Sequence, residues 1–190
     1  MALYKIFNEL RSSPETQKKV IEYLEPIKAV HYPTYEHSLR VGEMCLDASR
    51  ITGFDRTVMS LSGLLHDIGK AKIDPRILNK EGAPTEAEWK EIEKHPEIGY
   101  ELLKNDFPNI AQIVRRSHTP QKNGYPVIEV FSPNEIAHVV NIIDFYDALK
   151  HRKNSQIKFN GFKNARELMI NEKPDQRALI EELYGAGIFT

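Results

Sequence analysis

Signals that start helices recur along the 190-residue chain and constrain its fold more than any other feature. Ser13 precedes a proline and a glutamate, so the serine can cap a helix whose first turn holds the proline. Thr85 and Glu88 form a capping-box pattern, and Ser132 is followed by proline, asparagine and glutamate. No segment alternates convincingly between apolar and polar residues; residues 125–131 come nearest, and we expect them to form a loop. The sequence therefore predicts an all-α helical bundle.

Bulk composition narrows the class of protein. A length of 190 residues fits one domain, and a formal net charge of −1 gives no argument for binding nucleic acid polymers or membranes. No apolar run approaches the roughly 20 residues that span a bilayer, and residues 1–9 are too interrupted for a signal peptide. The single cysteine, Cys45, lies on an apolar helix face and is expected to be a small buried residue. We therefore expect a cytoplasmic protein.

A histidine and a carboxylate, His66 and Asp67, are adjacent at the end of an apolar run. Neighbouring helical side chains diverge by roughly a quarter turn, so both reach one ion only if the helix ends there. Gly69 is expected to supply that bend in a left-handed conformation. Imidazole and carboxylate suit a divalent transition metal, and Lys70 is close enough to hold an anion over it. The pattern favours a metal-dependent phosphohydrolase site, although a lone pair of this kind is more often a polar helix end.

Other histidines and a second aspartate occupy apolar helix faces or helix ends, namely His37, His95, His118 and Asp144. His37 shares a helical period with Val41 and Cys45, and a proline follows His95 where one helix should stop. A carboxylate among aliphatic residues costs several kcal/mol unless a cation or a donor satisfies it. Together with His66 and Asp67, these residues favour a shared metal centre over separate structural roles.

The order of these residues resembles the HD-domain superfamily of metal-dependent phosphohydrolases, whose core motif is H…HD…D. His37, His66, Asp67 and Asp144 match that motif in order. The chain is most similar to the HD-GYP branch, known for cyclic di-GMP phosphodiesterases. The matching segments are 37–41, 65–70, 77–80, 95–99, 124–126 and 144–149.

The resemblance implies a domain over residues 31–155, with an N-terminal helical extension at 1–30 and C-terminal helices at 156–190. It implies one metal held by His37, His66, Asp67 and Asp144. Asp67 would bridge to a second metal held also by His95 and His118. Four imidazoles point to iron or manganese rather than magnesium, which prefers oxygen ligands.

The implied activity is hydrolysis of a nucleotide phosphoester, such as that of a cyclic dinucleotide, by a metal-activated hydroxide. Asp67 and Lys70 would be the catalytic residues, and Lys70 would neutralise a phosphate oxygen. Substrate contacts would come from Lys70, Arg115, Lys122 and Tyr125. The alternative is a degenerate domain that binds metal or nucleotide as a sensor or partner module without turnover. A homo-oligomer is compatible with either function.

The sequence also departs from the family pattern. The family's His-His-Glu and Trp-Asp-Gly elements are reduced to residues 117–126, which contain one histidine and are one residue shorter. The Asp-Arg-Pro-Tyr-Arg element after the last motif is replaced by residues 151–154. Pro33 stands where some relatives carry a glutamate for a third metal, so two metals are expected.

Several nearby residues have more ordinary interpretations. Asp147 either orients a ligand histidine or hydrogen-bonds at a helix turn, and the sequence favours neither. Trp89 is expected to pack in the core or between helices rather than to stack on a base. Three further histidines are not expected to bind metal; they are His31, His138 and His151.

Overall fold

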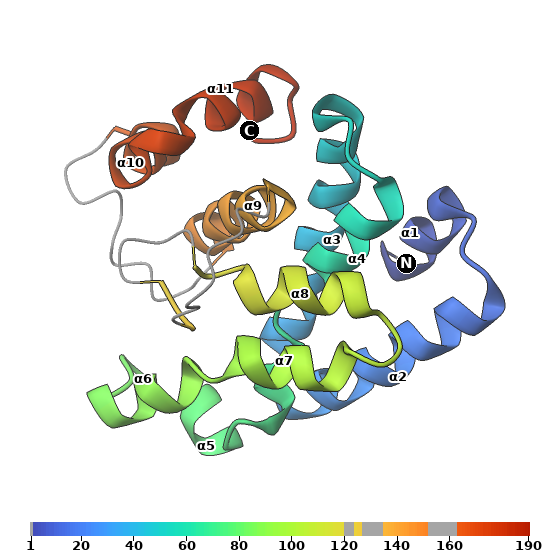
Figure 1. Cartoon of the computed structure of the whole chain (residues 1–190). Helices are drawn as coiled ribbons and strands as arrows, with labels where there is room; N and C mark the ends of the chain where they lie inside the picture. Colours follow the sequence, from blue (N-terminus) through green and yellow to red (C-terminus); the bar gives the residue numbers. More distant parts are fainter. Residues whose placement is uncertain (1, 120–123, 127–134, 152–162) are drawn as a thin grey trace.

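The computed structural model describes residues 2–119, 124–126, 135–151 and 163–190, and every regular element in these ranges is a helix (Figure 1). The α-helices are α1 (Ala2–Leu10), α2 (Pro14–Val30), α3 (Tyr32–Thr52), α4 (Arg56–Leu65), α5 (Pro75–Leu78), α6 (Glu86–Ile92), α7 (His95–Leu103), α8 (Pro108–Arg116), α9 (Glu135–His151), α10 (Ala165–Glu172) and α11 (Arg177–Gly185). Within the described ranges, the 3₁₀ helices are η1 (Ile68–Lys72) and η3 (Pro174–Gln176). The prediction of an all-α fold is confirmed.

Capping side chains start several of these helices as the sequence predicted. The Ser13 hydroxyl accepts a hydrogen bond from a backbone amide of the first turn of α2. Thr85 and Glu88 form both halves of a capping box at α6. Gly53, with φ of +72°, ends α3 in the left-handed conformation that glycine adopts readily. The cap predicted at Ser132 lies outside the described residues.

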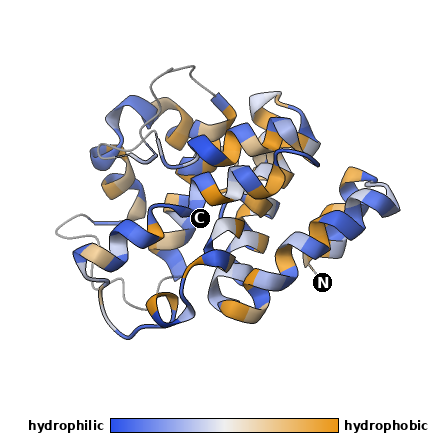
Figure 2. Cartoon of the chain, turned by 60° about the horizontal axis from the view of Figure 1, so that its bottom comes forward, coloured by the Kyte–Doolittle hydropathy of each residue, from blue (hydrophilic) through white to orange (hydrophobic). Residues whose placement is uncertain are grey.

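Two apolar clusters form the core on either side of the central pair α3 and α4. One cluster lies between α3, α4, α9 and the C-terminal helices α10 and α11. The other joins α1, α2, α4, η1 and α8. Figure 2 shows that single helices carry both hydrophobic and hydrophilic residues, as expected of amphipathic helices packed around a core. Cys45 is buried in the first cluster, as predicted.

Helix α4 ends just before His66 and Asp67, as predicted, but Gly69 does not act as expected. Its φ is not positive, so it is not a left-handed cap. A Cβ atom on Gly69 would instead lie 1.9 Å from the carbonyl oxygen of His95 and 2.8 Å from the amide nitrogen of Gly99. Glycine is needed here because η1 packs backbone against backbone on α7. The predicted reason for this glycine was therefore wrong.

The segments flanking the central helices pack onto them. Helix α1 packs against α3 and α4, α2 packs against α3 and η1, and α10 packs against α9 and α11. In the part of the chain that the structure describes, no helix has the length and apolar character needed to cross a membrane.

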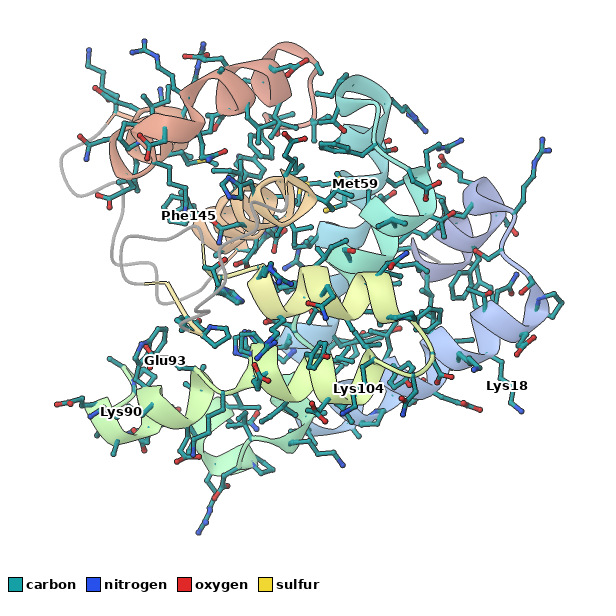
Figure 3. The ribbon with its side chains drawn as sticks, in the orientation of Figure 1. Lys18, Met59, Lys90, Glu93, Lys104 and Phe145 are labelled. Carbon is teal, nitrogen blue, oxygen red and sulfur yellow. The ribbon has the colours of Figure 1, made fainter. Side chains whose placement is uncertain are left out.

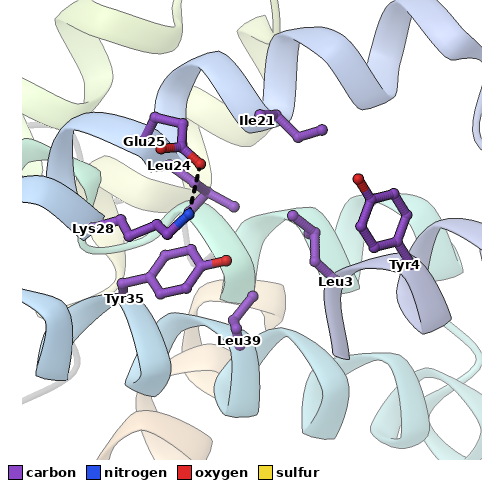
Figure 4. Close-up of a pocket in the computed structure, with 8 residues that line it drawn as sticks. All are labelled: Leu3, Tyr4, Ile21, Leu24, Glu25, Lys28, Tyr35 and Leu39. Atoms are coloured by element: carbon purple, nitrogen blue, oxygen red, sulfur yellow. Dashed lines mark hydrogen bonds and ion pairs between the residues drawn. The ribbon is translucent and has the colours of Figure 1, made fainter. Parts of the chain in front are cut away.

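A cavity of about 160 Å³ lies between α1, α2 and α3 (Figure 4). Its lining combines aliphatic and tyrosine side chains with one ion pair of 3.0 Å between Lys28 and Glu25. The Lys28 ammonium also lies 5.5 Å from the centre of the Tyr35 ring. The described lining residues include no histidine or aspartate, so this cavity is separate from the centre that the sequence predicts.

Candidate metal centre

Six buried side chains from separate parts of the chain converge where α3, α4, α7, α8 and α9 meet. They form two groups, and within each group one ligand atom per residue lies within 4.8 Å of the others. The first group is His37, His66 and Asp144; the second is Asp67, His95 and His118. All six side chains predicted as ligands are thus brought together, in the two sets that the sequence analysis expected around Asp67.

Asp67 directs one carboxylate oxygen toward each group. Its Oδ2 lies 3.5 Å from Nε2 of His66 and 3.9 Å from Nε2 of His37. Its Oδ1 lies 3.1 Å from Nε2 of His95 and 4.0 Å from Nε2 of His118. This arrangement is what a carboxylate bridging two metal ions requires.

Backbone carbonyl groups fix the orientation of two of the histidine rings. Nδ1 of His66 donates to the carbonyl oxygen of Gly63 at 2.7 Å, one turn earlier in α4. Nδ1 of His95 donates in the same way to Ile92, also at 2.7 Å. With the proton on Nδ1, the lone pair of Nε2 points into the centre and is available to a cation.

A carboxylate fixes the third ring. Nδ1 of His37 donates to Oδ2 of Asp147 at 2.7 Å. Arg40 clamps the same carboxylate, from Nε to Oδ1 at 2.7 Å and from Nη2 to Oδ2 at 2.8 Å. Burial opposes ionisation of Asp147, but these two partners lower its pKa to about 2. Of the two interpretations left open for Asp147, the structure shows the contact with a histidine.

Several buried polar atoms that point into the centre lack a hydrogen-bond partner among the described residues. These atoms are Nε2 of His66, and also Nε2 of His37 and Oδ1 of Asp67. The last two lie 3.0 Å from Oδ1 of Asp144 and 3.1 Å from Nε2 of His95, respectively, but in neutral rings with the proton on Nδ1 neither contact has a hydrogen to share. In addition, Nε2 of His95 and Nε2 of His118 are only 3.0 Å apart. A buried group without a partner costs roughly 1–3 kcal/mol, so this cluster fits a bound cation better than an empty interior.

The charges in the centre are strongly interdependent. Burial opposes protonation of His37, but the carboxylates of Asp144 and Asp147 raise its pKa to about 9. Burial also disfavours the charged form of Asp144, yet the His37 ring beside it keeps the pKa of that carboxyl far below its usual range. Burial lowers the pKa of His66 and of His118. The metal-free centre therefore holds a protonated His37 beside ionised carboxylates, with His66 and His118 kept neutral by burial. Once His37 loses its second ring proton, these carboxylates and imidazoles are a donor set suited to a divalent transition metal.

Two of the predicted substrate contacts lie at the centre. Nζ of Lys70 donates to Oδ2 of Asp67 at 2.6 Å, which places the ammonium at the junction of the two groups. The Tyr125 ring stacks on the His118 ring with centroids 5.0 Å apart and an angle of 9° between the planes. Gly124, directly before Tyr125, packs closely against the backbone of Thr119. A Cβ atom on Gly124 would lie 2.4 Å from the Thr119 carbonyl oxygen.

The other two predicted contacts are placed differently. Nε of Arg115 donates to Glu97 at 2.7 Å, and its guanidinium lies 5.0 Å from the centre of the Tyr100 ring. Arg115 would have to leave these partners to reach a phosphate, so its role stays a prediction. Lys122 lies outside the described residues.

Trp89 was predicted to pack in the core or between helices, and the first of these is wrong, because the residue is 43% exposed. The three histidines not expected to bind metal stand outside both groups. The His31 ring hydrogen-bonds with the Thr34 hydroxyl at the start of α3, and the His138 ring hydrogen-bonds with the Gln176 amide. The His151 ring contacts the Asp147 carboxylate.

Sequence analysis did not single out Asn141, which links the C-terminal helices to the centre. Its amide nitrogen donates to the carbonyl oxygen of Ser117 at 2.7 Å, directly before His118. Its amide oxygen accepts from Nζ of Lys173 at 2.7 Å. A lone asparagine in an apolar run, at residues 139–143, was the available signal, since a buried amide needs partners.

A family model described as the HD domain matches residues 34–152. The chain belongs to the HD domain family. The matched segment contains all six residues of the two groups, and the predicted family is confirmed.

Characterised relatives extend this result. The chain is 34% identical over 99 residues to the cyclic di-GMP phosphodiesterase response regulator RpfG of Xanthomonas campestris, covering 48% of this chain and 26% of that protein. It is 26% identical over 168 residues to 3'3'-cGAMP-specific phosphodiesterase 2 of Vibrio cholerae, covering 83% and 32%. It is 30% identical over 152 residues to a cyclic di-GMP phosphodiesterase of Pseudomonas aeruginosa, covering 76% and 37%. The chain therefore spans only about a quarter to over a third of these relatives.

A solved structure shares the fold. The HD domain of the phosphodiesterase PgpH from Listeria monocytogenes superposes with a TM-score of 0.57 at 17% identity, covering 87% of this chain and 85% of that one. This similarity extends beyond the residues matched by the family model and includes part of the flanking helices.

Proposed function

We propose that this chain is a metal-dependent phosphodiesterase that hydrolyses a cyclic dinucleotide, with cyclic di-GMP as the first substrate to test. The observation that carries the proposal is the pair of buried histidine and aspartate groups that share Asp67. The relatives that act on cyclic di-GMP or 3'3'-cGAMP support the substrate class.

Two divalent metal ions fit the two groups. His37, His66 and Asp144 would hold the first ion, with Asp67 between it and a second ion held by His95 and His118. Four imidazoles favour iron or manganese, whereas magnesium prefers oxygen ligands and retains its waters. When bound, such ions supply Lewis acidity toward a phosphoryl oxygen and lower the pKa of water.

The protein's own residues position these groups and balance their charge. Asp147 keeps a proton of His37 on Nδ1, so that Nε2 can offer its lone pair to a metal ion in the centre. Lys70 holds its ammonium 2.6 Å from Asp67, where it can reach a phosphate oxygen bound at the junction of the groups. A fixed positive charge there stabilises the negative charge that develops on the phosphoryl oxygens during hydrolysis. Tyr125 and, if it is released from Glu97, Arg115 would contact the rest of the substrate, as would Lys122.

We also propose that residues 31–155 form the catalytic domain, with residues 1–30 and 156–190 as helical extensions on either side. The contacts of α1 and α2 with α3, and of α10 with α9, support this division.

Turnover of a phosphoester panel by manganese- or iron-loaded protein tests the proposal, with cyclic di-GMP, 3'3'-cGAMP, a linear dinucleotide and a mononucleotide in the panel. We expect hydrolysis of a cyclic dinucleotide. Asp67→Ala should abolish activity and weaken metal binding together, because this carboxylate contacts both groups. Lys70→Ala should slow turnover while leaving the metal content unchanged. Tight nucleotide binding with no hydrolysis of any ester would instead identify a sensor domain.

A further inference from the structure

Trp89 lies in an unusual place for a tryptophan. Helix α6 buries none of its residues, and Trp89 is 43% exposed. Figure 3 shows α6 at one edge of the molecule, with Lys90 on the helix and Glu93 directly after its end. An indole on such a helix contributes little to a core, although burial of its large apolar surface is what usually makes tryptophan stabilising. Packing therefore does not explain this residue.

Ring contacts connect Trp89 to the candidate metal centre. The Trp89 and Tyr125 rings meet edge to face, with centroids 6.4 Å apart and an angle of 83°. The Tyr125 ring also stacks on the His118 ring, with centroids 5.0 Å apart. Tyr125 also lies 6.0 Å from the His95 ring. A continuous line of aromatic rings thus runs from the second group of the centre to the exposed indole.

The charges around the indole permit an anionic ligand to approach. Helix α6 contains three glutamates, and each is paired with a lysine. The pairs are Glu86 with Lys90 at 2.8 Å, Glu88 with Lys80 at 2.7 Å, and Glu91 with Lys94 at 2.6 Å. Pairing with lysines offsets the charge of these three glutamates, which reduces their repulsion of a phosphate group.

The position also suits the shape of a nucleotide. A phosphate bound at the metal centre would have its nucleobase one ribose away, in the direction of some neighbouring surface. The exposed indole, two ring contacts from His118, is a flat surface on which such a base could stack. Base stacking on aromatic side chains contributes about 1–3 kcal/mol per base, and a bicyclic indole overlaps best with a bicyclic purine.

We infer that Trp89 is a stacking site for a purine base of the substrate, next to the Tyr125 ring that covers His118. For its substrate class this inference depends on the proposed function. It assigns the choice between purine and pyrimidine dinucleotides to a residue outside the two ligand groups.

Trp89 is the single tryptophan of the chain, so its fluorescence reports directly on the site. Manganese-loaded protein would be mixed in a stopped-flow instrument with cyclic di-GMP or with a pyrimidine cyclic dinucleotide. We expect saturable quenching by cyclic di-GMP, with at least fivefold weaker binding of the pyrimidine ligand. Saturable binding of cyclic di-GMP measured by calorimetry, with unchanged tryptophan fluorescence, would overturn the inference.

Kinetics of Trp89→Ala and Trp89→Phe give an independent test. Stacking predicts a KM for cyclic di-GMP raised about 5- to 150-fold in Trp89→Ala, largely restored in Trp89→Phe, with kcat changed less than about twofold. Tyr4→Ala is the matched control, because Tyr4 is an aromatic residue 63% exposed on α1 and should leave both constants unchanged. A KM unchanged in Trp89→Ala, or a loss confined to kcat, would contradict stacking. If the wild-type protein hydrolysed nothing, the proposed function would fail, and the fluorescence titration would still decide the role of Trp89.

Discussion

The contact between Asp147 and His37 allows a sharp test of how the first metal group is built. Asp147 touches no other ring of the two groups, and its carboxylate accepts from both His37 and Arg40. Asp147→Asn keeps an oxygen that can accept the Nδ1 proton of His37 but removes the negative charge. Asp147→Ala removes both the charge and the acceptor. Comparison of the two variants therefore separates electrostatics from orientation.

The size of the expected effect follows from the geometry. A hydrogen-bonded partner behind a ligand histidine typically contributes 10- to 100-fold in metal affinity or activity, which is about 1.4–2.8 kcal/mol. Because the 2.7 Å contact is buried and charged, we expect the upper end of this range for Asp147→Ala and about tenfold for Asp147→Asn. Removing the carboxylate also makes His37 easier to deprotonate, which favours metal binding. The net loss is still expected, because a carboxylate stabilises a divalent ion more strongly than a single proton.

Manganese affinity would be measured by calorimetric titration of metal-free protein, together with kcat at saturating metal. Either change removes the negative charge that pairs with Arg40, so Arg40→Gln, alone and combined with Asp147→Asn, measures that separate cost. Thermal unfolding of the metal-free variants shows whether they are folded. If folded Asp147→Ala bound manganese within twofold of the wild-type affinity, the contact between Asp147 and His37 would not support metal binding.

Two further predictions concern packing and pH. Gly69→Ala should lower the free energy of unfolding by about 1–3 kcal/mol or more, because its Cβ would lie 1.9 Å from the His95 carbonyl oxygen. Gly185→Ala, at a glycine with no atom within 4 Å of the added Cβ and no positive φ, should change it little; equal costs would contradict the close packing of η1 on α7. The pKa of His37 is raised to about 9, so its contribution to the stability of metal-free protein is complete below pH 6.5 and is lost as the pH rises through 9. The melting temperature of metal-free protein should therefore fall between pH 6.5 and 9.5, and a folded His37→Gln variant should lose most of that slope; the same slope in both proteins would show that His37 is not its source.

Local chemistry explains which parts of the fold could be predicted from the sequence. The caps at Ser13 and Thr85 depend on residues within one helical turn, so these helix starts can be predicted from residues adjacent in the sequence. The six candidate ligands were also recognisable, because a histidine or aspartate on an apolar face needs a special reason to be there. Their assembly into two groups around Asp67 was expected from the family resemblance rather than from the spacing of the residues.

Contacts between distant segments explain what could not be predicted. Gly69 looked like a helix cap, but its reason is the backbone of α7, which no local pattern reveals. The pairing of Arg115 with Glu97 joins two helices and gives this guanidinium a partner that no local pattern reveals. Trp89 occupies a helix position where an apolar residue normally faces a core. Only the structure shows that α6 buries none of its residues and that Trp89 is exposed.

The metal content of the purified protein shows whether the two groups of histidine and aspartate bind ions. Freshly purified wild-type protein, prepared without chelators, would be compared by mass spectrometry of its metals with Asp67→Ala and with His138→Ala, a histidine that stands outside both groups. We expect close to two iron or manganese ions per wild-type chain, the same content in His138→Ala, and a marked loss in Asp67→Ala. Wild-type protein that stays free of transition metal even after incubation with excess manganese, while correctly folded, would contradict this expectation.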